Sequence, residues 1–407
     1  MPNLALTEKD KIIQFSTFAF LVTFNVLSTT SFATPLMFLF TVIILVNINF
    51  KMDFYKYHLF VMQFCMFCYS SIFWARNGLI TLNTSKAILQ VIICMFIFYD
   101  YYKKFNDIHV LLKIYMWSSY VVVFVTYAYY GPSAFIESME DARLDSSFAN
   151  VNYIAMVAST VLVIHTYYVL YEKEPKWQFL LVGIPTLLVI SATQSRKALV
   201  TFAVGVTLLY IIKYSMKGRG NLIPYIKIFT GLVIAIILVY LLSDTALFSG
   251  ITHRMEGLVA SITGEGEEDS SSYARRFYRQ IGWIQFSRTP VLGIGINNAF
   301  MLTNIATGKN AYLHCNYAEL AADGGSVGLF SYYIIFAYVF FKELKYVRKD
   351  TSAIIIIVWI INRLIYDWGA VTYTNKMTYF IIMIYYLHLS YMEKKYPSPK
   401  RRKKYLR

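Results

Sequence analysis

The chain has little charge, few cysteines and no nucleotide-binding fingerprint. Only 15% of its 407 residues are charged and 57% are hydrophobic, whereas charged residues make up about a quarter of a soluble domain. This composition excludes an ordinary soluble domain and indicates an integral membrane protein. It has neither a P-loop nor a dinucleotide-binding glycine motif, so we expect no ATP-driven work by this chain.

The four cysteines suggest neither a disulfide framework nor a metal site. Cys65 and Cys68 form a Cys-x-x-Cys pair inside an apolar stretch, where packing is a better interpretation than redox or zinc chemistry. His314 has no histidine or carboxylate pair at ligand spacing, and no Asp-x-Asp-like pair stands at an outer helix end. We therefore predict neither a metal site nor a cofactor.

What the chain does have is a series of apolar stretches, each near the roughly 20 residues of a membrane-spanning helix. We predict an all-α polytopic membrane protein with about twelve such helices. They cover residues 12–27, 33–50, 57–75, 79–99, 108–128, 150–171, 177–192, 198–212, 222–243, 317–341, 352–368 and 377–392. No small-residue cleavage site follows the first stretch, so we interpret it as a retained helix.

The net charge of +15 is unevenly distributed. Lysine and arginine concentrate in alternate connecting segments and at both ends of the chain, and they are scarce in the short loops between. This bias predicts that both termini are cytoplasmic. The basic tail Lys400–Lys404 suits an anionic inner leaflet better than a nucleic acid, so we expect membrane lipids and no nucleic acid as partners.

This topology divides the chain into four segments. They are residues 1–243 with nine helices, an extracytoplasmic loop at 244–316, residues 317–392 with three helices, and a basic cytoplasmic tail at 393–407. The long loop contains an acidic, serine-rich stretch at 264–272, which we interpret as solvated. A second outer loop is expected at 129–149.

Residues 273–286 of the long loop have the spacing of an amphipathic helix. Phe277, Ile281 and Ile284 share one face, which would lie against the membrane. The adjoining face carries Arg275, Arg276 and Arg279. These arginines could bind ordinary lipid headgroups or a specific anionic substrate. A turn at 290–295, with Pro290, Gly293 and Gly295, is expected to end the helix.

Two further arginines, Arg196 and Arg363, lie at the end of or within apolar stretches of the sequence. Arg196 is expected at an outer helix end, as either an interfacial arginine or a ligand for phosphate oxygens. Arg363 and Asp367 are four residues apart in an apolar stretch. Their spacing favours an ion pair, with a role in an outer cavity as the alternative.

The segment Tyr312–Leu320 places polar side chains at the outer mouth of an apolar helix. With a usual pKa near 6.5, His314 could act as a base at neutral pH, or it could be structural. Asn316 and Tyr317 could orient a sugar or the imidazole. Glu319 could hold one imidazole tautomer, although it is five residues further on.

Taken in order, these features resemble the O-antigen ligase/Wzy-type polymerase family of bacterial surface glycans. The matching segments are Ser195–Leu199, Arg276–Gly295 and Tyr312–Gly328, with a long outer loop after the ninth helix. The resemblance implies a GT-C-like membrane glycosyltransferase. Its donor would be a glycan on undecaprenyl diphosphate at the outer face of the bacterial cytoplasmic membrane.

The resemblance also implies roles for single residues. Arg196 would contact the diphosphate, as would Arg276 or Arg279, while Arg275 makes the register ambiguous. His314 corresponds to the family histidine, a proposed base for the acceptor hydroxyl. Cys315 departs from the family pattern, because many members have asparagine there.

Three functions remain open at this point. The first is a polymerase that joins lipid-linked oligosaccharide repeats by metal-independent, inverting transfer, with a chain-length regulator as a possible partner. The second is a ligase that moves the glycan to a lipid core or a protein. A transporter of lipid-linked glycans is the third, and it would require paired halves and broken helices, which the sequence does not clearly contain.

Overall fold

The computed structural model describes residues 7–27, 33–48, 54–140, 144, 149–217 and 270–397. Every regular element in these ranges is a helix, as predicted. The first elements are α1 Glu8–Leu27, α2 Ala33–Asn47, α3 Lys56–Ser70, η1 Ser71–Phe73, α4 Gly78–Tyr102, η2 Lys103–Phe105 and α5 His109–Glu140. They are followed by α6 Val151–Tyr171, α7 Lys176–Ala192, α8 Arg196–Lys217, α11 Ser270–Arg288, α12 Phe300–Thr307, α13 Asn316–Glu343, α14 Ser352–Asp367 and α15 Lys376–Lys395.

Eleven of the twelve predicted apolar stretches are helical, and their ends lie a few residues from those expected, except that α5 continues to Glu140 instead of residue 128. The ninth stretch, 222–243, lies outside the described residues, as do residues 264–269 and the end of the basic tail from residue 398. Within the described ranges, five helices are long and apolar enough to cross a membrane: Gly78–Phe105, His109–Phe135, Val151–Tyr171, Arg196–Met216 and Asn316–Glu343. The chain therefore has the character of a multi-pass membrane protein, and the count of twelve and the GT-C-like arrangement stay predictions.

The chain forms two compact units, which we describe separately. The first unit contains Met1–Ile43, His109–Asp269 and Asp350–Asn362, and the second contains Ile44–Ile108, Ser270–Lys349 and Arg363–Arg407. The chain therefore passes repeatedly from one unit to the other. The four-segment division expected from topology stays a prediction.

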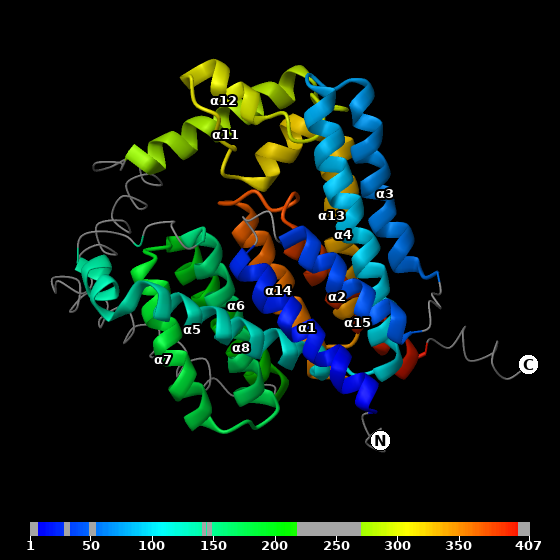
Figure 1. Ribbon diagram of the computed structural model, residues 1–407, viewed down its shortest axis with the longest axis vertical. Helices are drawn as coiled ribbons and strands as arrows, with labels where there is room; N and C mark the ends of the chain where they lie inside the picture. The colour runs from blue at the N-terminus through cyan, green and yellow to red at the C-terminus, as the bar shows by residue number, and fades with distance from the viewer. Residues whose placement is uncertain are drawn as a thin grey trace, which may run out of the picture. The chain divides into compact units, whose positions relative to one another are not determined.

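In the first unit, α6 is the central helix. It packs against α5, α7 and α8, while α1 packs against α5 (Figure 1). Small residues of α6 allow this close approach: Ala155 and Ala158 are fully buried in the same core cluster as Val189 of α7 and Ala198 of α8. A hydrogen bond of 2.9 Å between the hydroxyls of Ser159 and Thr201 joins α6 to α8 in addition.

The outer loop predicted at 129–149 is wrong in its first half. Helix α5 continues to Glu140 after a kink at Gly131, which has φ 76° and ψ 164°. Pro132 follows at once, where its fixed φ suits the first turn of a new helical segment and its missing N–H costs nothing. Gly131 and Pro132, a pair typical of a turn, therefore form a kink between two helical segments of α5.

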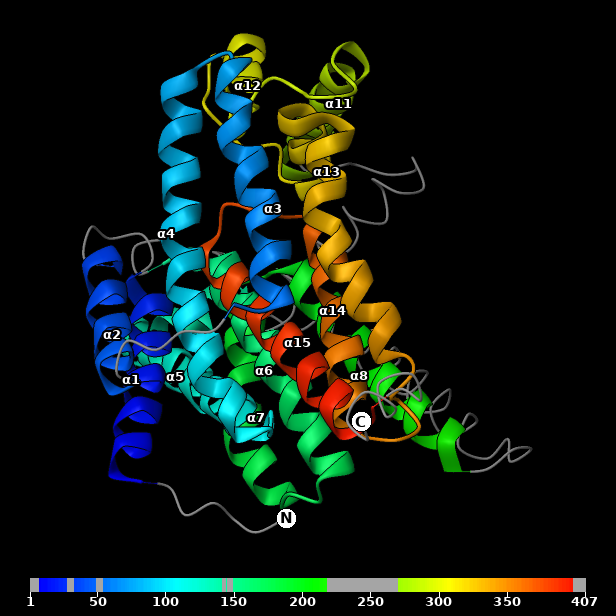
Figure 2. The ribbon, with the colours of Figure 1, turned by 90° about the vertical axis from the view of Figure 1, so that its right-hand side faces the viewer.

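In the second unit, α3 and α4 run side by side, and α13 packs against α3 (Figure 2). Helix α15 contacts both α4 and α13, and α11 covers the beginning of the α13 region. The core is rich in tyrosine. The rings of Tyr57 and Tyr99 stack 4.7 Å apart, and the Tyr99 hydroxyl lies 2.6 Å from that of Ser390. The Tyr99 ring thus fills apolar space while its hydroxyl bonds to a partner.

The predicted helix at 273–286 is present as α11, which begins at Ser270 and so includes the last residues of the stretch expected to be solvated. The short helix α12 was not predicted. Its eight residues are too few to establish a period, so the segment reads as part of a loop. Because Gly308 follows it in a left-handed conformation, α12 ends in a glycine cap.

Residues 290–295 lie along a break in α13. Helix α13 is interrupted at Gly325, where φ is 60°. Beside the break, the N–H groups of Ser326 and Val327 donate to the carbonyls of Pro290 and Val291 at 2.8 and 3.1 Å. The N–H of Gly295 donates to the carbonyl of Asp323 at 2.9 Å. The expected glycine turn is thus hydrogen-bonded to α13, which begins more than 20 residues later in the sequence.

We expect Gly293→Ala to destabilise the protein by about 3 kcal/mol or more. Gly293 has φ 68°, and an added Cβ would lie 2.4 Å from the backbone carbonyl of Asp323. Gly308→Ala is the matched control, because Gly308 has φ 70° but no atom within 4 Å of the added Cβ. Conformational strain alone should cost this control about 1–2 kcal/mol. Equal shifts of the two variants in thermal unfolding would contradict the close approach.

Candidate functional site

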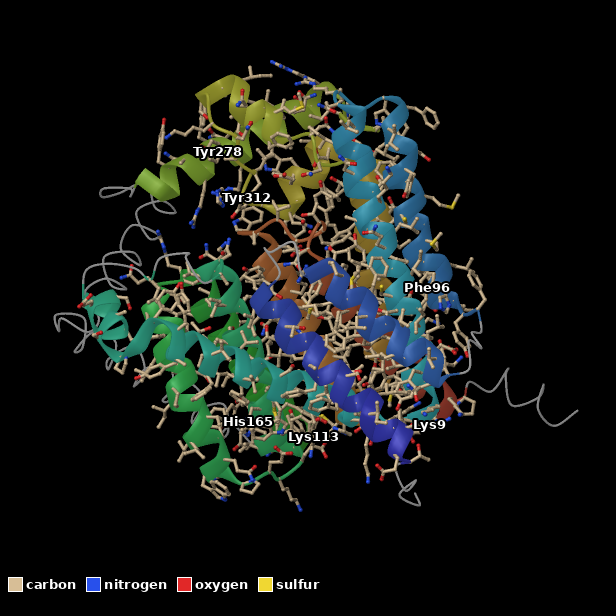
Figure 3. All side chains as sticks on the ribbon, viewed as in Figure 1. Lys9, Phe96, Lys113, His165, Tyr278 and Tyr312 are labelled. Carbon is tan, nitrogen blue, oxygen red and sulfur yellow. The ribbon has the colours of Figure 1, made fainter. Side chains whose placement is uncertain are left out.

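His314 lies two residues before α13, in a left-handed conformation with φ 57°. Its imidazole is half-buried and has two tyrosine rings near it. The Tyr278 ring from α11 stacks on it at 6.2 Å with an interplanar angle of 11°, and the Tyr312 ring lies 4.1 Å away. Both tyrosines are labelled in Figure 3. The histidine singled out in the sequence therefore lies in an aromatic setting that restricts its ring.

Glu319 acts on the backbone just before His314. Its carboxylate is buried in the first turn of α13 and accepts the N–H of Leu313 at 2.6 Å. The sequence suggested a contact between Glu319 and the imidazole of His314, although the two are five residues apart. The hydrogen bond from Leu313 fixes the backbone directly before His314. In this arrangement Glu319 is a positioning residue.

The three arginines of α11 have different surroundings. The guanidinium of the half-buried Arg279 lies 5.9 Å from the centre of the Trp368 ring, and its charge reaches the thiol of Cys315. Arg276 is exposed and lies 5.6 Å over the ring of Tyr273 on its own helix. The charge of Arg275 reaches the buried Tyr366. The charge of Arg279 therefore acts on Cys315, the residue directly after His314.

Cys315 is buried directly after His314. Burial raises the pKa of its thiol, while the charge of Arg279 acts in the opposite direction. The residue caps α13 at its N-terminus with an extended backbone. Its small, uncharged side chain fits this apolar cluster with Leu313 and Ala318.

Asn316 and Tyr317 bond to other parts of the second unit. The Oδ1 of the buried Asn316 accepts the N–H groups of Thr372 and Tyr373 at 2.8 and 3.0 Å, and its Nδ2 donates to the Tyr333 hydroxyl at 2.7 Å. The Tyr317 hydroxyl donates to the carbonyl of Leu364 at 2.8 Å. The sugar-orienting role considered for these residues stays a prediction. Asn316 holds the loop after α14, and Tyr317 bonds to α14 itself.

Arg363 and Asp367 form the ion pair that their spacing predicts. The Arg363 Nε lies 3.1 Å from the Asp367 Oδ1, and both side chains are buried. Asp367 also accepts from the hydroxyls of Thr372 and Tyr333 at 2.6 and 2.9 Å. A buried charge needs such partners, because removing it from water costs several kcal/mol. This pair belongs to the same bonded cluster as Asn316.

Asp323 is the site residue that sequence reasoning missed. Its fully buried carboxylate accepts the N–H groups of Asn297, Asn298 and Ala299 at 3.1, 2.8 and 2.7 Å. It also accepts the hydroxyl of Tyr373 at 2.7 Å. Burial and the Asp323 charge raise the pKa of Tyr373, which keeps this phenol protonated as a donor. The available signal was a carboxylate four residues after Glu319 in an apolar helix, since such a group needs a partner.

Arg196 belongs to the first unit, where it is the first residue of α8. The turn before it is fixed: Gln194 has φ 47°, and its Nε2 donates to the carbonyl of Ser138 at 2.9 Å. The carbonyl of the buried Ser195 accepts the N–H groups of Ala198 and Leu199. Arg196 is half-buried. The structure thus places this arginine at a helix end, as predicted, on a well-supported turn.

The described residues contain no group of three or more His, Cys, Asp or Glu side chains arranged to hold a metal ion. Two tyrosine rings lie near His314, and one of them, that of Tyr278, belongs to α11, the helix that also carries Arg279. Such groups suit a sugar and a phosphate, because aromatic rings stack on apolar sugar faces and arginine binds phosphate oxygens.

We expect Asn316→Ala to destabilise the protein by about 2–4 kcal/mol, because two buried N–H groups lose their acceptor. Asn304→Ala in α12 is the control, since this side chain is exposed and its loss should change the free energy of unfolding by less than about 0.5 kcal/mol. Thermal unfolding of the purified chain in detergent measures both. A stability of Asn316→Ala equal to that of the control would contradict the structural role of Asn316.

Residues 179–333 match the family model described as O-antigen ligase. This match covers less than half of the chain and runs from α7 through most of α13. It therefore includes Arg196, the arginines of α11, His314 and Asp323. No curated protein matches the chain. The match over residues 179–333 supports the resemblance of the chain to the O-antigen ligase/Wzy-type family.

Proposed function

We propose that the protein is a glycosyltransferase that uses a glycan on a polyprenyl diphosphate as its donor and a sugar hydroxyl as its acceptor. Members of its family are glycosyltransferase-like enzymes that act on lipid-linked glycans. The observation that carries the proposal is the setting of His314, whose ring lies near those of Tyr278 and Tyr312 in the unit that also holds Arg279. These residues all lie inside the matched domain.

The reaction needs a base and cations. In the proposed step the acceptor oxygen forms a bond to the anomeric carbon, and the bond from that carbon to the diphosphate oxygen breaks. His314 takes the proton of the acceptor hydroxyl on a ring nitrogen. The diphosphate leaves on the lipid carrier, and its developing charge is stabilised by arginine. A direct displacement of this kind inverts the anomeric centre.

The proposal assigns the diphosphate to Arg279 and Arg196. Arg279 is favoured over Arg276 because its charge reaches Cys315, the residue next to His314. Arginine suits the task because it stays protonated and can donate two parallel hydrogen bonds to phosphate oxygens. Arg275 is a supporting cation on the same helix. The reaction as proposed requires no cofactor.

We further propose that the acceptor is a second lipid-linked glycan, so that the protein is a polymerase of repeat units. The site would face the outside of the bacterial cytoplasmic membrane, with both termini inside, as the distribution of lysine and arginine predicts. A ligase that transfers the glycan to a lipid core or a protein is the second candidate, because the matching family model carries the description O-antigen ligase.

Purified protein given only a lipid-linked repeat should form a ladder of longer glycans if it is a polymerase, and no ladder if it is a ligase.

We expect His314→Asn to lower the rate of glycan transfer by about 10²–10⁴-fold, the usual contribution of a general base. Asparagine tolerates the left-handed conformation of residue 314, so this variant removes the imidazole while keeping the local backbone. The measurement is single-turnover transfer from a lipid-linked donor, with the melting temperature as a check of folding. A folded variant with the activity of the unsubstituted chain would exclude His314 as the base.

The two loop arginines should differ in their effect. We expect Arg279→Ala to lower the transfer rate by about 10²–10³-fold, as for loss of one preorganised charge-stabilising group. Arg276→Ala is the matched control on the same helix and should change the rate much less, because its side chain is exposed. Arg196→Ala should behave like Arg279→Ala. Equal rates for the Arg276 and Arg279 variants would remove the assignment of the diphosphate to Arg279.

A further inference from the structure

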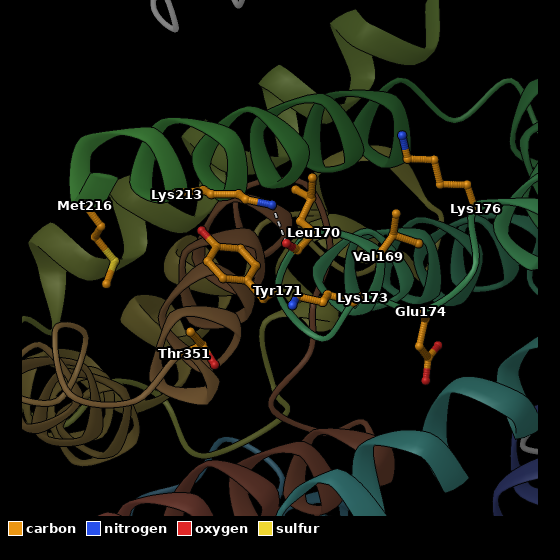
Figure 4. A pocket seen from close by; sticks show the side chains of 9 residues that line it. All are labelled: Val169, Leu170, Tyr171, Lys173, Glu174, Lys176, Lys213, Met216 and Thr351. Atoms are coloured by element: carbon orange, nitrogen blue, oxygen red, sulfur yellow. Dashed lines mark hydrogen bonds between the residues drawn. The ribbon is translucent and has the colours of Figure 1, made fainter. Parts of the chain in front are cut away.

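The first unit contains a cavity of about 550 Å³ that the proposed reaction does not use. It lies where α6 ends and α7 begins, beside the end of α8 (Figure 4). Its walls are Val169, Leu170, Tyr171, Lys173, Glu174, Lys176, Lys213, Met216 and Thr351. All of them belong to the first unit. The cavity is large enough for a polar headgroup of a few heavy atoms, and its walls combine apolar and cationic side chains.

The charge of the cavity is positive. Three lysines line it, namely Lys173, Lys176 and Lys213, against one carboxylate, that of Glu174. This carboxylate is neutralised from outside the cavity, because Lys113 lies 2.9 Å from its Oε1. The lining therefore presents an excess of ammonium groups to anything that enters, and an ammonium group binds a phosphate oxygen as a point charge.

The cavity is a built feature of the fold. The Nζ of Lys213 donates to the carbonyl of Leu170 at the end of α6 and lies 5.6 Å over the Tyr171 ring. The Tyr171 hydroxyl in turn donates to the carbonyl of Leu209 on α8 at 2.7 Å. Lys173 has φ 58° in the short connection between α6 and α7. These contacts hold Lys213 against the end of α6, directly before the connection that carries Lys173.

An apolar surface begins at the same place. Helix α7 starts at Lys176, in the cavity wall, and continues with exposed apolar residues. They are Trp177, Leu180, Leu181, Ile184 and Leu188, with 41% to 67% of each side chain accessible. Their spacing of three and four residues puts them on one side of the helix. A tryptophan at the polar end of such a surface is typical of a helix at a membrane–water interface.

We propose that this cavity binds the anionic headgroup of a phospholipid whose acyl chains lie against the exposed side of α7. The lysines bind the phosphate, and the exposed apolar side chains of α7 contact the acyl chains. A soluble phosphate would use only the first of these two features. By the predicted topology every wall residue lies on the cytoplasmic side, where anionic lipids attract basic segments. The proposal does not depend on the chemistry at His314.

The test uses the purified full chain in neutral detergent. Phosphatidylglycerol, phosphatidylcholine or inorganic phosphate is added, and the melting temperature and the number of bound lipids by native mass spectrometry are recorded. We expect phosphatidylglycerol alone to raise the melting temperature and to stay bound. Lys173→Gln/Lys213→Gln should weaken its binding by about 25-fold, or about fivefold for each lysine. Lys173→Gln alone, on an exposed side chain, keeps the test independent of the packing of Lys213.

The matched control is Lys342→Gln/Lys345→Gln in the second unit. Lys342 lies 5.5 Å over the Tyr338 ring, as Lys213 lies over Tyr171, and Lys345 is exposed as Lys173 is. This control should bind phosphatidylglycerol as the unsubstituted chain does. An equal loss in both double variants, or equal binding of phosphatidylcholine, would overturn the proposal. An equal stabilisation by inorganic phosphate would show an anion site without a lipid.

Discussion

The second unit depends on one buried carboxylate. Asp323 accepts three successive backbone N–H groups, from Asn297 to Ala299, and the hydroxyl of Tyr373. An ionised carboxylate without partners would be very costly in this apolar interior. Satisfying it therefore forces a loop before α12 and a loop before α15 to meet at one point of α13. The glycines at 293 and 325 are what allow the backbones to approach closely enough for this.

The same arrangement is repeated along the first turns of α13. Asn316 accepts N–H groups from the loop after α14, Glu319 accepts the N–H of Leu313, and Asp323 accepts those of the loop before α12. Each side chain holds a connecting segment that has no regular partner of its own. The polar residues at the start of an apolar helix thus form a scaffold for loops. His314 and Tyr312 are carried on one of these loops, next to α11.

The helices could be predicted from the sequence because their apolar residues extend over many turns, and eleven of the twelve expected stretches are helical. His314 could be singled out because a polar group at the end of an apolar helix is unusual. The partners of Asn316 and Tyr317 could not be predicted, since Thr372 and Leu364 lie about fifty residues further along the chain. Asp323 was missed for the same reason: its four partners come from two distant loops, and no local pattern connects them.

The hydrogen bond from Leu313 to Glu319 supports the left-handed backbone conformation of His314. A left-handed conformation in a residue other than glycine costs about 1–3 kcal/mol and persists only where the surroundings determine it. Here the surroundings are the bond from Leu313 to Glu319, the helix start at Asn316 and the two flanking tyrosine rings. The strain is therefore balanced before any substrate arrives. In the reaction proposed above, a His314 base held in this way would need little reorganisation in the transition state, which is how positioning contributes to catalysis.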